Sequence, residues 1–136
     1  MISGSQLKKV DFLHGLTEEE LQRITHFFTE EDVGAGVTLC EEGVKAERLY
    51  VLEQGKVSIS FRNGRKYHID TPGKIVGWSF LVPPFFYTAS VVTVTPSKLL
   101  VTKDTKFYYF IHREPKIEIK VLSNLTQVIA SRLRGM

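Results

Sequence analysis

His68 and Asp70 are the residues whose types and spacing best fit metal chemistry. They stand two positions apart in a stretch typical of a β-strand, so both side chains would point to one face. Jelly-roll enzymes of the cupin kind bind metal ions with histidine and carboxylate ligands spaced in this way. The other histidines fall on or beside predicted helices and supply no third ligand (His14, His26, His112). A solvent-facing pair on a hairpin is the favoured interpretation, and a metal-dependent enzyme is the weakest functional hypothesis.

The chain contains no other arrangement typical of catalysis. It lacks a Gly-x-Ser-x-Gly elbow, a glycine-rich phosphate loop and a suggestive pair of carboxylates. Its one cysteine, Cys40, cannot form an internal disulfide or hold a structural zinc or an iron–sulfur cluster alone. A haem ligand is disfavoured, because a lone cysteine on a strand usually packs as a small core residue. We therefore expect no enzyme and no resident metal, in a reducing cytoplasm.

The composition predicts one soluble globular domain. The 136 residues suffice for one core, and 43% of them are hydrophobic. The net charge of +3 comes from basic residues interleaved with acidic ones, which gives weak support for nucleic-acid binding. Residues 75–97 are uncharged and long enough for a membrane span. Pro83-Pro84 in their middle argues against a lipid-facing helix, and no signal peptide is indicated.

The elements that must position these side chains begin with a short helix and continue as strands. Thr17 and Glu20 form a capping box that starts the helix. Its predicted buried face consists of Leu21, Ile24 and Phe28. From residue 31 to 102, glycines divide the chain into short runs rich in Val, Ile, Tyr and Phe, which predict an antiparallel barrel or jelly roll. Asn63-Gly64 has the chemistry of a type I′ hairpin turn.

Helical periodicity returns near the C-terminus. Asp104 is the predicted N-cap of one helix, and Pro115 is predicted to start another. The last helix carries an apolar stripe wider than one contact needs (Val121, Leu122, Leu125, Val128, Ile129, Leu133). We expect a homodimer through Leu122, Leu125 and Ile129, the alternative being that the stripe only covers its own barrel. The predicted single domain 1–136 thus has parts 1–30 (helical), 31–103 (β-roll) and 104–136 (helices).

This order of elements resembles the cyclic nucleotide-binding domain, the sensor module of catabolite-activator regulators. The stretch LCEEGVKAERLYVLEQGKVSIS, from Leu39 to Ser60, is similar to that family's strand–Gly–strand signature, with Gly43 and Gly55 at the turns. The resemblance extends from about residue 7 to residue 134. It implies a ligand-sensing regulatory function and helices, 104–134, that move when ligand binds.

The resemblance places the family's phosphate-binding cassette between Gly77 and Ala89. Family members carry a Gly-Glu pair at the start of a short helix, and then Arg-Ser-Ala or Arg-Thr-Ala. Gly77 and Thr88-Ala89 match these landmarks, but Trp78 stands where the glutamate would be. Tyr87, or Phe86 if the gap shifts by one, stands where the arginine would be. Loss of that bidentate charge-assisted contact implies weak or altered cyclic-nucleotide binding.

The resemblance therefore predicts a ligand site with unusual chemistry. The predicted ligand-binding residues are Gly77, Trp78, Ser79, Phe80, Tyr87, Thr88 and Ala89. Backbone donors after Gly77, with Ser79 and Thr88, could hold an anion, and a basic residue of a neighbouring strand could reach it (Arg62, Arg65, Lys66, Lys74). The aromatic residues of this segment, Trp78, Phe80, Phe85, Phe86 and Tyr87, would line the same concavity and suit a stacked ring or a hydrophobic ligand.

Two functional hypotheses follow. The first is a dimeric sensor of a cyclic nucleotide or another small ligand. The second is a ligand-free interaction scaffold for a protein partner, in which aromatic side chains plug the pocket. Regulators of this class continue into a DNA-binding helix-turn-helix that needs several tens of further residues, so we expect no direct DNA binding by this chain. The sequence leaves open whether it is a complete protein or a sensor fragment.

Overall fold

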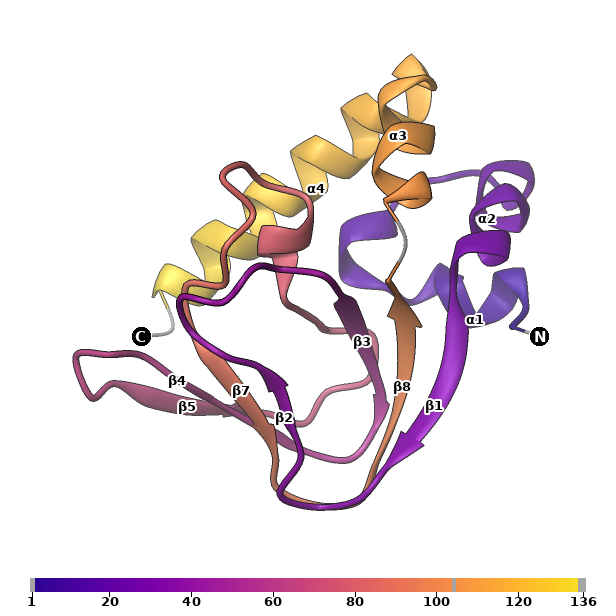
Figure 1. Ribbon diagram of the computed structural model, residues 1–136. Helices are drawn as coiled ribbons and strands as arrows, with labels where there is room; N and C mark the ends of the chain where they lie inside the picture. The colour runs from indigo at the N-terminus through magenta and orange to yellow at the C-terminus, as the bar shows by residue number, and fades with distance from the viewer. Residues whose placement is uncertain (1, 104, 135–136) are drawn as a thin grey trace.

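Two antiparallel sheets form a roll that is covered at one end by helices from both termini (Figure 1). The computed structural model describes residues 2–103 and 105–134. Within these ranges the sheets have the strand orders β1-β8-β3-β6 and β2-β7-β4-β5. The strands are β1 (Thr29–Val33), β2 (Thr38–Cys40), β3 (Leu49–Gln54), β4 (Val57–Ser60), β5 (Lys66–Ile69), β6 (Ile75–Val76), β7 (Ser90–Thr93) and β8 (Ser97–Thr102). The predicted jelly roll is confirmed, with its first strand two residues earlier than predicted.

The N-terminal segment consists of short helices. These are α1 (Gly4–Lys8), η1 (Asp11–Leu13), α2 (Glu18–Ile24) and η2 (Thr25–Phe27). The predicted capping box is present: the Glu20 N–H donates to Thr17 Oγ1 at 3.1 Å, and the Thr17 N–H donates to Glu20 Oε1 at 2.9 Å. Ser3 and Gln6 form a second capping box, which starts α1, a helix that was not predicted. These caps fix where each helix begins, because they satisfy otherwise unpaired backbone donors.

The β4–β5 hairpin has a different turn from the predicted one. Ser60 pairs with Lys66, and the Phe61 N–H donates to the Arg65 carbonyl at 2.9 Å. The Gly64 N–H then donates to the Phe61 carbonyl at 2.9 Å, and Gly64 has φ +89° while Asn63 is not in the left-handed region. A type I′ turn needs positive φ at both central residues, so this is a three-residue loop with glycine in the left-handed position.

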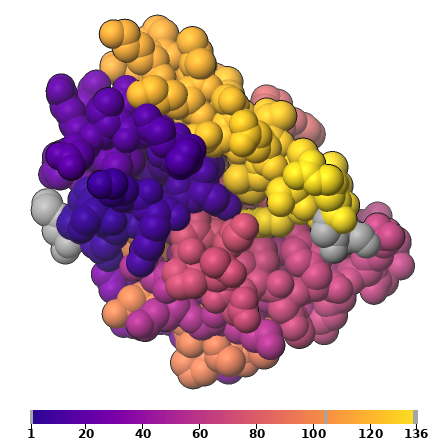
Figure 2. Space-filling view, turned by 180° about the vertical axis from the view of Figure 1, so that it is seen from behind, coloured from indigo at the N-terminus to yellow at the C-terminus, as the bar shows by residue number. Residues whose placement is uncertain are grey.

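The C-terminal helices lie across the end of the roll. They are α3 (Lys106–His112) and α4 (Pro115–Arg134), the latter beginning at Pro115 as predicted. Asp104, the predicted N-cap, lies outside the described residues. Figure 2 shows α4 running between the N-terminal helices and the middle of the chain. The buried residues of α4 lie on one face (Ile117, Val121, Leu125, Arg132). In the described part of the chain, no helix has the length and apolar character that crossing a membrane requires.

Candidate functional site

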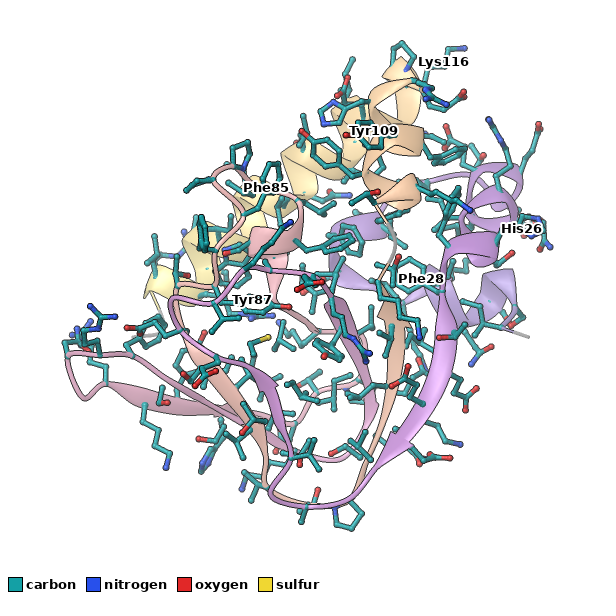
Figure 3. The ribbon with its side chains drawn as sticks, in the orientation of Figure 1. His26, Phe28, Phe85, Tyr87, Tyr109 and Lys116 are labelled. Carbon is teal, nitrogen blue, oxygen red and sulfur yellow. The ribbon has the colours of Figure 1, made fainter. Side chains whose placement is uncertain are left out.

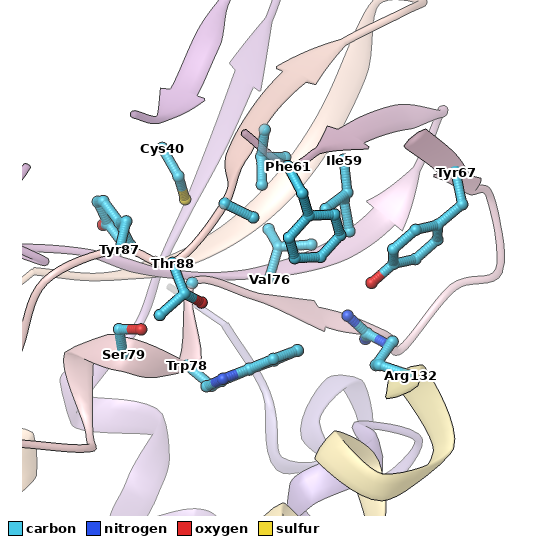
Figure 4. A pocket seen from close by; sticks show the side chains of 13 residues that line it. Cys40, Ile59, Phe61, Tyr67, Val76, Trp78, Ser79, Tyr87, Thr88 and Arg132 are labelled. Atoms are coloured by element: carbon cyan, nitrogen blue, oxygen red, sulfur yellow. The ribbon is translucent and has the colours of Figure 1, made fainter. Parts of the chain in front are cut away.

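A small pocket lies inside the roll, beneath the last turn of α4 (Figure 4). It is lined by Cys40, Ile59, Phe61, Tyr67, Val76, Gly77, Trp78, Ser79, Tyr87, Thr88, Ala89, Val91 and Arg132. The structure therefore brings six of the seven predicted ligand-binding residues to one cavity. Its volume is about 30 Å³, which is room for about one water molecule. Ligand pockets usually measure about 300–1,000 Å³, so a nucleotide requires these side chains to move.

Gly77 sets the course of the cassette segment. Its backbone is in the left-handed region with φ +84°, directly before η3 (Trp78–Phe80). A β-carbon at this position would lie 3.1 Å from the Arg48 carbonyl and 3.3 Å from Cys40 Sγ. Glycine is favoured there by both the conformation and the close packing. Because η3 has only three residues, it offers few aligned backbone dipoles for an anion.

The Tyr87 hydroxyl is hydrogen-bonded to the backbone of Arg48, the residue before β3. The hydroxyl donates to the Arg48 carbonyl at 2.6 Å and accepts from the Arg48 N–H at 3.1 Å. Burial raises the pKa of Tyr87 and also raises the pKa of the Cys40 thiol to about 12. Both groups are therefore neutral at physiological pH, and this end of the pocket holds no charge.

The predicted aromatic lining is only partly correct. Trp78 and Tyr87 line the pocket, whereas Phe80 and Phe85 line a separate cavity beside α3. Figure 3 shows Phe85 above Tyr87, on the side of α3, and its ring packs edge-on against Tyr108 of that helix, with centroids 5.5 Å apart. Phe86 is 50% exposed, because it pairs with Lys45 in an isolated bridge and its side chain alternates with that of its neighbour Tyr87. The Phe80 side chain points into a different cavity from that of Trp78, because successive side chains of a 3₁₀-helix point about 120° apart.

Arg132 is the basic residue of the pocket, and the sequence analysis did not identify it. None of the four basic residues considered there lines the pocket. Arg62 is paired with Glu42 at 2.9 Å, and Arg65 and Lys66 are exposed. Lys74 lines a separate cavity, which Asp11 and Arg132 also line. Arg132 reaches the pocket because it lies on the buried face of α4.

The Arg132 guanidinium is held from several sides. Its Nη2 donates to the Ile75 carbonyl at 2.6 Å and lies 3.7 Å from Asp11 Oδ2. Its central carbon lies 5.4 Å from the centre of the Trp78 ring, a cation–π contact. Burial raises the pKa of Asp11, with the nearby Arg132 charge acting in the opposite direction. Nη1 is buried and has no hydrogen-bond partner among the described residues.

The remaining predicted sites lie elsewhere. Leu125 is 3% exposed and belongs to the core of the single chain, so the structure corrects its assignment to a dimer contact. Leu122 is 44% exposed and Ile129 is half-buried, which leaves both accessible to a partner. His68 and Asp70 are exposed. Among the described residues, no group of three or more His, Cys, Asp or Glu could hold a metal ion.

Comparisons with known proteins agree on the family of this chain. A family model described as the cyclic nucleotide-binding domain matches residues 30–114. A Geobacter metallireducens protein assigned as a cyclic nucleotide-binding protein has a TM-score of 0.86 and 25% identity, over 98% of this chain and 99% of that one. A cyclic nucleotide-binding domain from Methylobacillus flagellatus has a TM-score of 0.79 and 20% identity, over 96% and 76%. The Thermus thermophilus catabolite activator protein has a TM-score of 0.70 and 26% identity, over 92% and 59%. The comparison with curated proteins finds no match.

Proposed function

Because the chain belongs to the cyclic nucleotide-binding domain family, we propose that it is a ligand-sensing regulatory module whose cyclic-nucleotide binding is weak or altered. The observation that carries the altered preference is the uncharged cassette end of the pocket. By the resemblance described above, Trp78 stands where the family has glutamate, and Tyr87, or Phe86 if the gap shifts by one, stands where it has arginine. The Tyr87 hydroxyl is bonded to Arg48. A phosphate there lacks the bidentate arginine contact, whose charge-assisted hydrogen bonds are each worth about 1.5–3 kcal/mol.

Helix α4 is the element that would transmit ligand occupancy. It contributes Arg132 to the pocket, while the neighbouring side of the helix exposes Leu122 and, in part, Ile129. A ligand that favours one position of the last turns of α4 would shift the population toward that position. The proposed homodimer through the exposed face of α4 would carry that shift to a second copy or to a protein partner. We also propose a cytoplasmic location, because a single unpaired cysteine suits a reducing compartment.

Thermal unfolding with and without cyclic AMP and cyclic GMP tests the proposed function. A ligand at 100 times its dissociation constant stabilises the folded state by about 2.7 kcal/mol, which raises the unfolding midpoint measurably. We expect a small or absent rise for the native chain and a clear rise for the double variant Trp78→Glu with Tyr87→Arg. Thr88→Ala is expected to weaken any phosphate-containing ligand. No gain by the double variant would mean that the cassette does not lie where we place it.

A ligand-free scaffold is the second candidate, and one observation favours it. The cavity has room for about one water molecule because Trp78, Tyr87 and Arg132 fill the rest. The scaffold predicts a stable dimer in light scattering whose unfolding midpoint responds to no small molecule. A ligand-induced rise in the midpoint would exclude it.

A further inference from the structure

The positive charge of the pocket lies at the α4 end, away from Cys40, Ser79 and Tyr87. Cys40, Ser79 and Tyr87 form an uncharged end, and Figure 4 shows Arg132 entering from α4 at the other end, beside Trp78. Of the described residues that line the pocket, Arg132 alone carries a formal charge. An anionic group therefore gains most by binding at the α4 end, where it meets a charge in a low-dielectric surrounding.

Two buried donors converge at this end. Arg132 is 8% exposed, and its Nη1 has no hydrogen-bond partner among the described residues. The Tyr67 hydroxyl is likewise buried without a partner in that part of the chain, and Figure 4 shows it pointing toward the guanidinium. The Tyr67 ring is held in place by stacking on Phe61, with centroids 6.1 Å apart and planes inclined by 19°. Buried polar groups normally have partners, so these two donors indicate an acceptor between them.

The lining next to Arg132 is apolar and partly aromatic. Ile59, Phe61, Val76 and the Trp78 ring surround the space next to Arg132. Such surfaces suit a planar apolar body, while the guanidinium fork matches the geometry of a carboxylate or a phosphate oxygen pair. Resting on the ligand-sensing function proposed above, we propose that the ligand is a small monoanion with a planar apolar body, and that Arg132 and the Tyr67 hydroxyl bind its anionic group.

The negative charge of Asp11 does not occupy the part of the Arg132 guanidinium that faces the proposed ligand. Asp11 does not line the pocket, and its Oδ2 approaches Nη2, the nitrogen that already donates to Ile75. The 3.7 Å between Oδ2 and Nη2 is too long for a hydrogen bond, and Asp11 leaves the Nη1 donor without a partner among the described residues. The Lys74 charge also acts on Asp11, so one further negative charge at Nη1 balances the two cations and Asp11. A dianion would leave one charge buried without a partner, which is costly.

The position of Arg132 links this ligand to α4. Among the described residues of α4 that follow Leu125, Arg132 is the one that is buried. Its contacts therefore fasten the last turns of the helix. Ligand entry requires the guanidinium and Trp78 to separate, because the present cavity is too small. The bound anion would then replace those contacts, and the last turns of α4 would report whether the pocket is occupied.

The test compares anions with uncharged analogues of the same shape. The unfolding midpoint and the dissociation constant are measured with benzoate against benzamide, and with cyclic AMP against adenosine. We expect at least one anion to bind while its uncharged partner does not. Comparing benzoate with cyclic AMP then shows whether the anionic group of the ligand is a carboxylate or a phosphodiester.

Three variants assign the contact. Arg132→Gln should weaken anion binding about 10- to 150-fold, the effect of one hydrogen bond to a charged group. Tyr67→Phe should also weaken anion binding. Because this variant keeps the stacked ring, it tests the contact even if Arg132→Gln does not fold. Arg134→Gln, on the same helix but exposed, is the matched control and should leave the dissociation constant unchanged. Hydrogen exchange over residues 126–134 should slow with the bound anion in the native chain.

The outcomes separate this inference from the proposed function. If an uncharged analogue binds as well as its anion, or if both Arg132→Gln and Tyr67→Phe bind normally, the module still senses a ligand and the assignment of the anion to Arg132 and Tyr67 is wrong. If none of the four compounds binds, both the inference and the sensing function lose their support, and the scaffold is favoured.

Discussion

The Arg132 guanidinium lies 5.4 Å from the centre of the Trp78 ring, so a side chain from the last turn of α4 covers the first residue of η3. The same guanidinium donates to the Ile75 carbonyl, 57 positions earlier in the chain. These contacts join the end of the last helix to the start of the cassette segment. The last turns of α4 are thus fastened by Trp78 and by the Ile75 carbonyl.

Tyr87→Phe should destabilise the fold without altering its shape. The substitution removes the hydroxyl that pairs with both the N–H and the carbonyl of Arg48. Buried polar groups that lose a partner cost about 1–3 kcal/mol, and we expect a loss of that size in the free energy of unfolding measured with urea. Tyr109→Phe, at a position that is 54% exposed, is the matched control and should change little. Equal stability of Tyr87→Phe would mean that water replaces the hydroxyl.

Cys40 should be nearly inert while the chain is folded. Burial raises the pKa of its thiol to about 12. At about pH 8 only about one thiol in 10,000 would then be the reactive thiolate. An aromatic disulfide reagent should label the native protein slowly and the denatured protein at the rate of a free cysteine. Because the sequence has one cysteine, the absorbance change reports this site alone. Rapid labelling of the native protein would show that the pocket opens often.

Asp11→Asn should change how stability depends on pH. Burial raises the pKa of Asp11 above its ordinary value of 3.8, so folding disfavours the ionised carboxylate. The stability linked to this group is present below the pKa of the unfolded chain and is lost as pH rises through the raised pKa. Each unit of the rise corresponds to about 1.4 kcal/mol. Urea unfolding should show that, as pH rises through this range, the free energy of unfolding of Asp11→Asn increases relative to that of the native chain. Above the raised pKa the difference between the two should stay constant.

The exposed Asp70→Asn is the control for that experiment, because it removes a charge without changing a buried group. Its difference from the native chain should not follow the pattern of Asp11→Asn. If the stability of Asp11→Asn instead falls relative to that of the native chain as pH rises, the attraction between Asp11 and Arg132 outweighs the cost of burying the carboxylate.

Leu125 and Leu122 should separate folding from dimerisation. Leu125→Ala removes a fully buried side chain and should cost about 2–5 kcal/mol of folding stability. Leu122→Glu places a charge on the exposed face of α4 and should leave the monomer stable while preventing a dimer. Light scattering measures the mass, and urea unfolding measures the stability. A dimeric Leu122→Glu would show that this face of α4 is not the interface.

Much of the fold could be predicted from local patterns. The capping residues Thr17 and Glu20 and the helix-starting Pro115 act on their own neighbours, so their sequence signals survive folding unchanged. The turn after β4 was harder. Asn63-Gly64 fits a type I′ turn locally, but the register of β4 and β5 requires a three-residue loop, so only Gly64 takes positive φ.

The site was predicted as a segment but not as a set of contacts. The signal for Arg132 was present in the spacing of the buried face of α4, which runs Ile117, Val121, Leu125, Val128 and Arg132 in steps of three and four. The sequence analysis overlooked that Arg132 continues this face. The aromatic residues of the cassette segment were grouped because they are neighbours in sequence, although their backbone sends them to different cavities.

Local patterns in the sequence were enough to predict most of the elements, their order and the uncharged character of the cassette, because caps, alternation and glycine positions act over a few residues. Which charge serves the pocket depends on tertiary packing. Arg132 reaches Ile75 and Trp78 because α4 packs its buried face across the end of the roll, and that packing depends on contacts between residues far apart in the chain. Short-range patterns predict where a helix lies along the chain, whereas its neighbours in space determine what its side chains do.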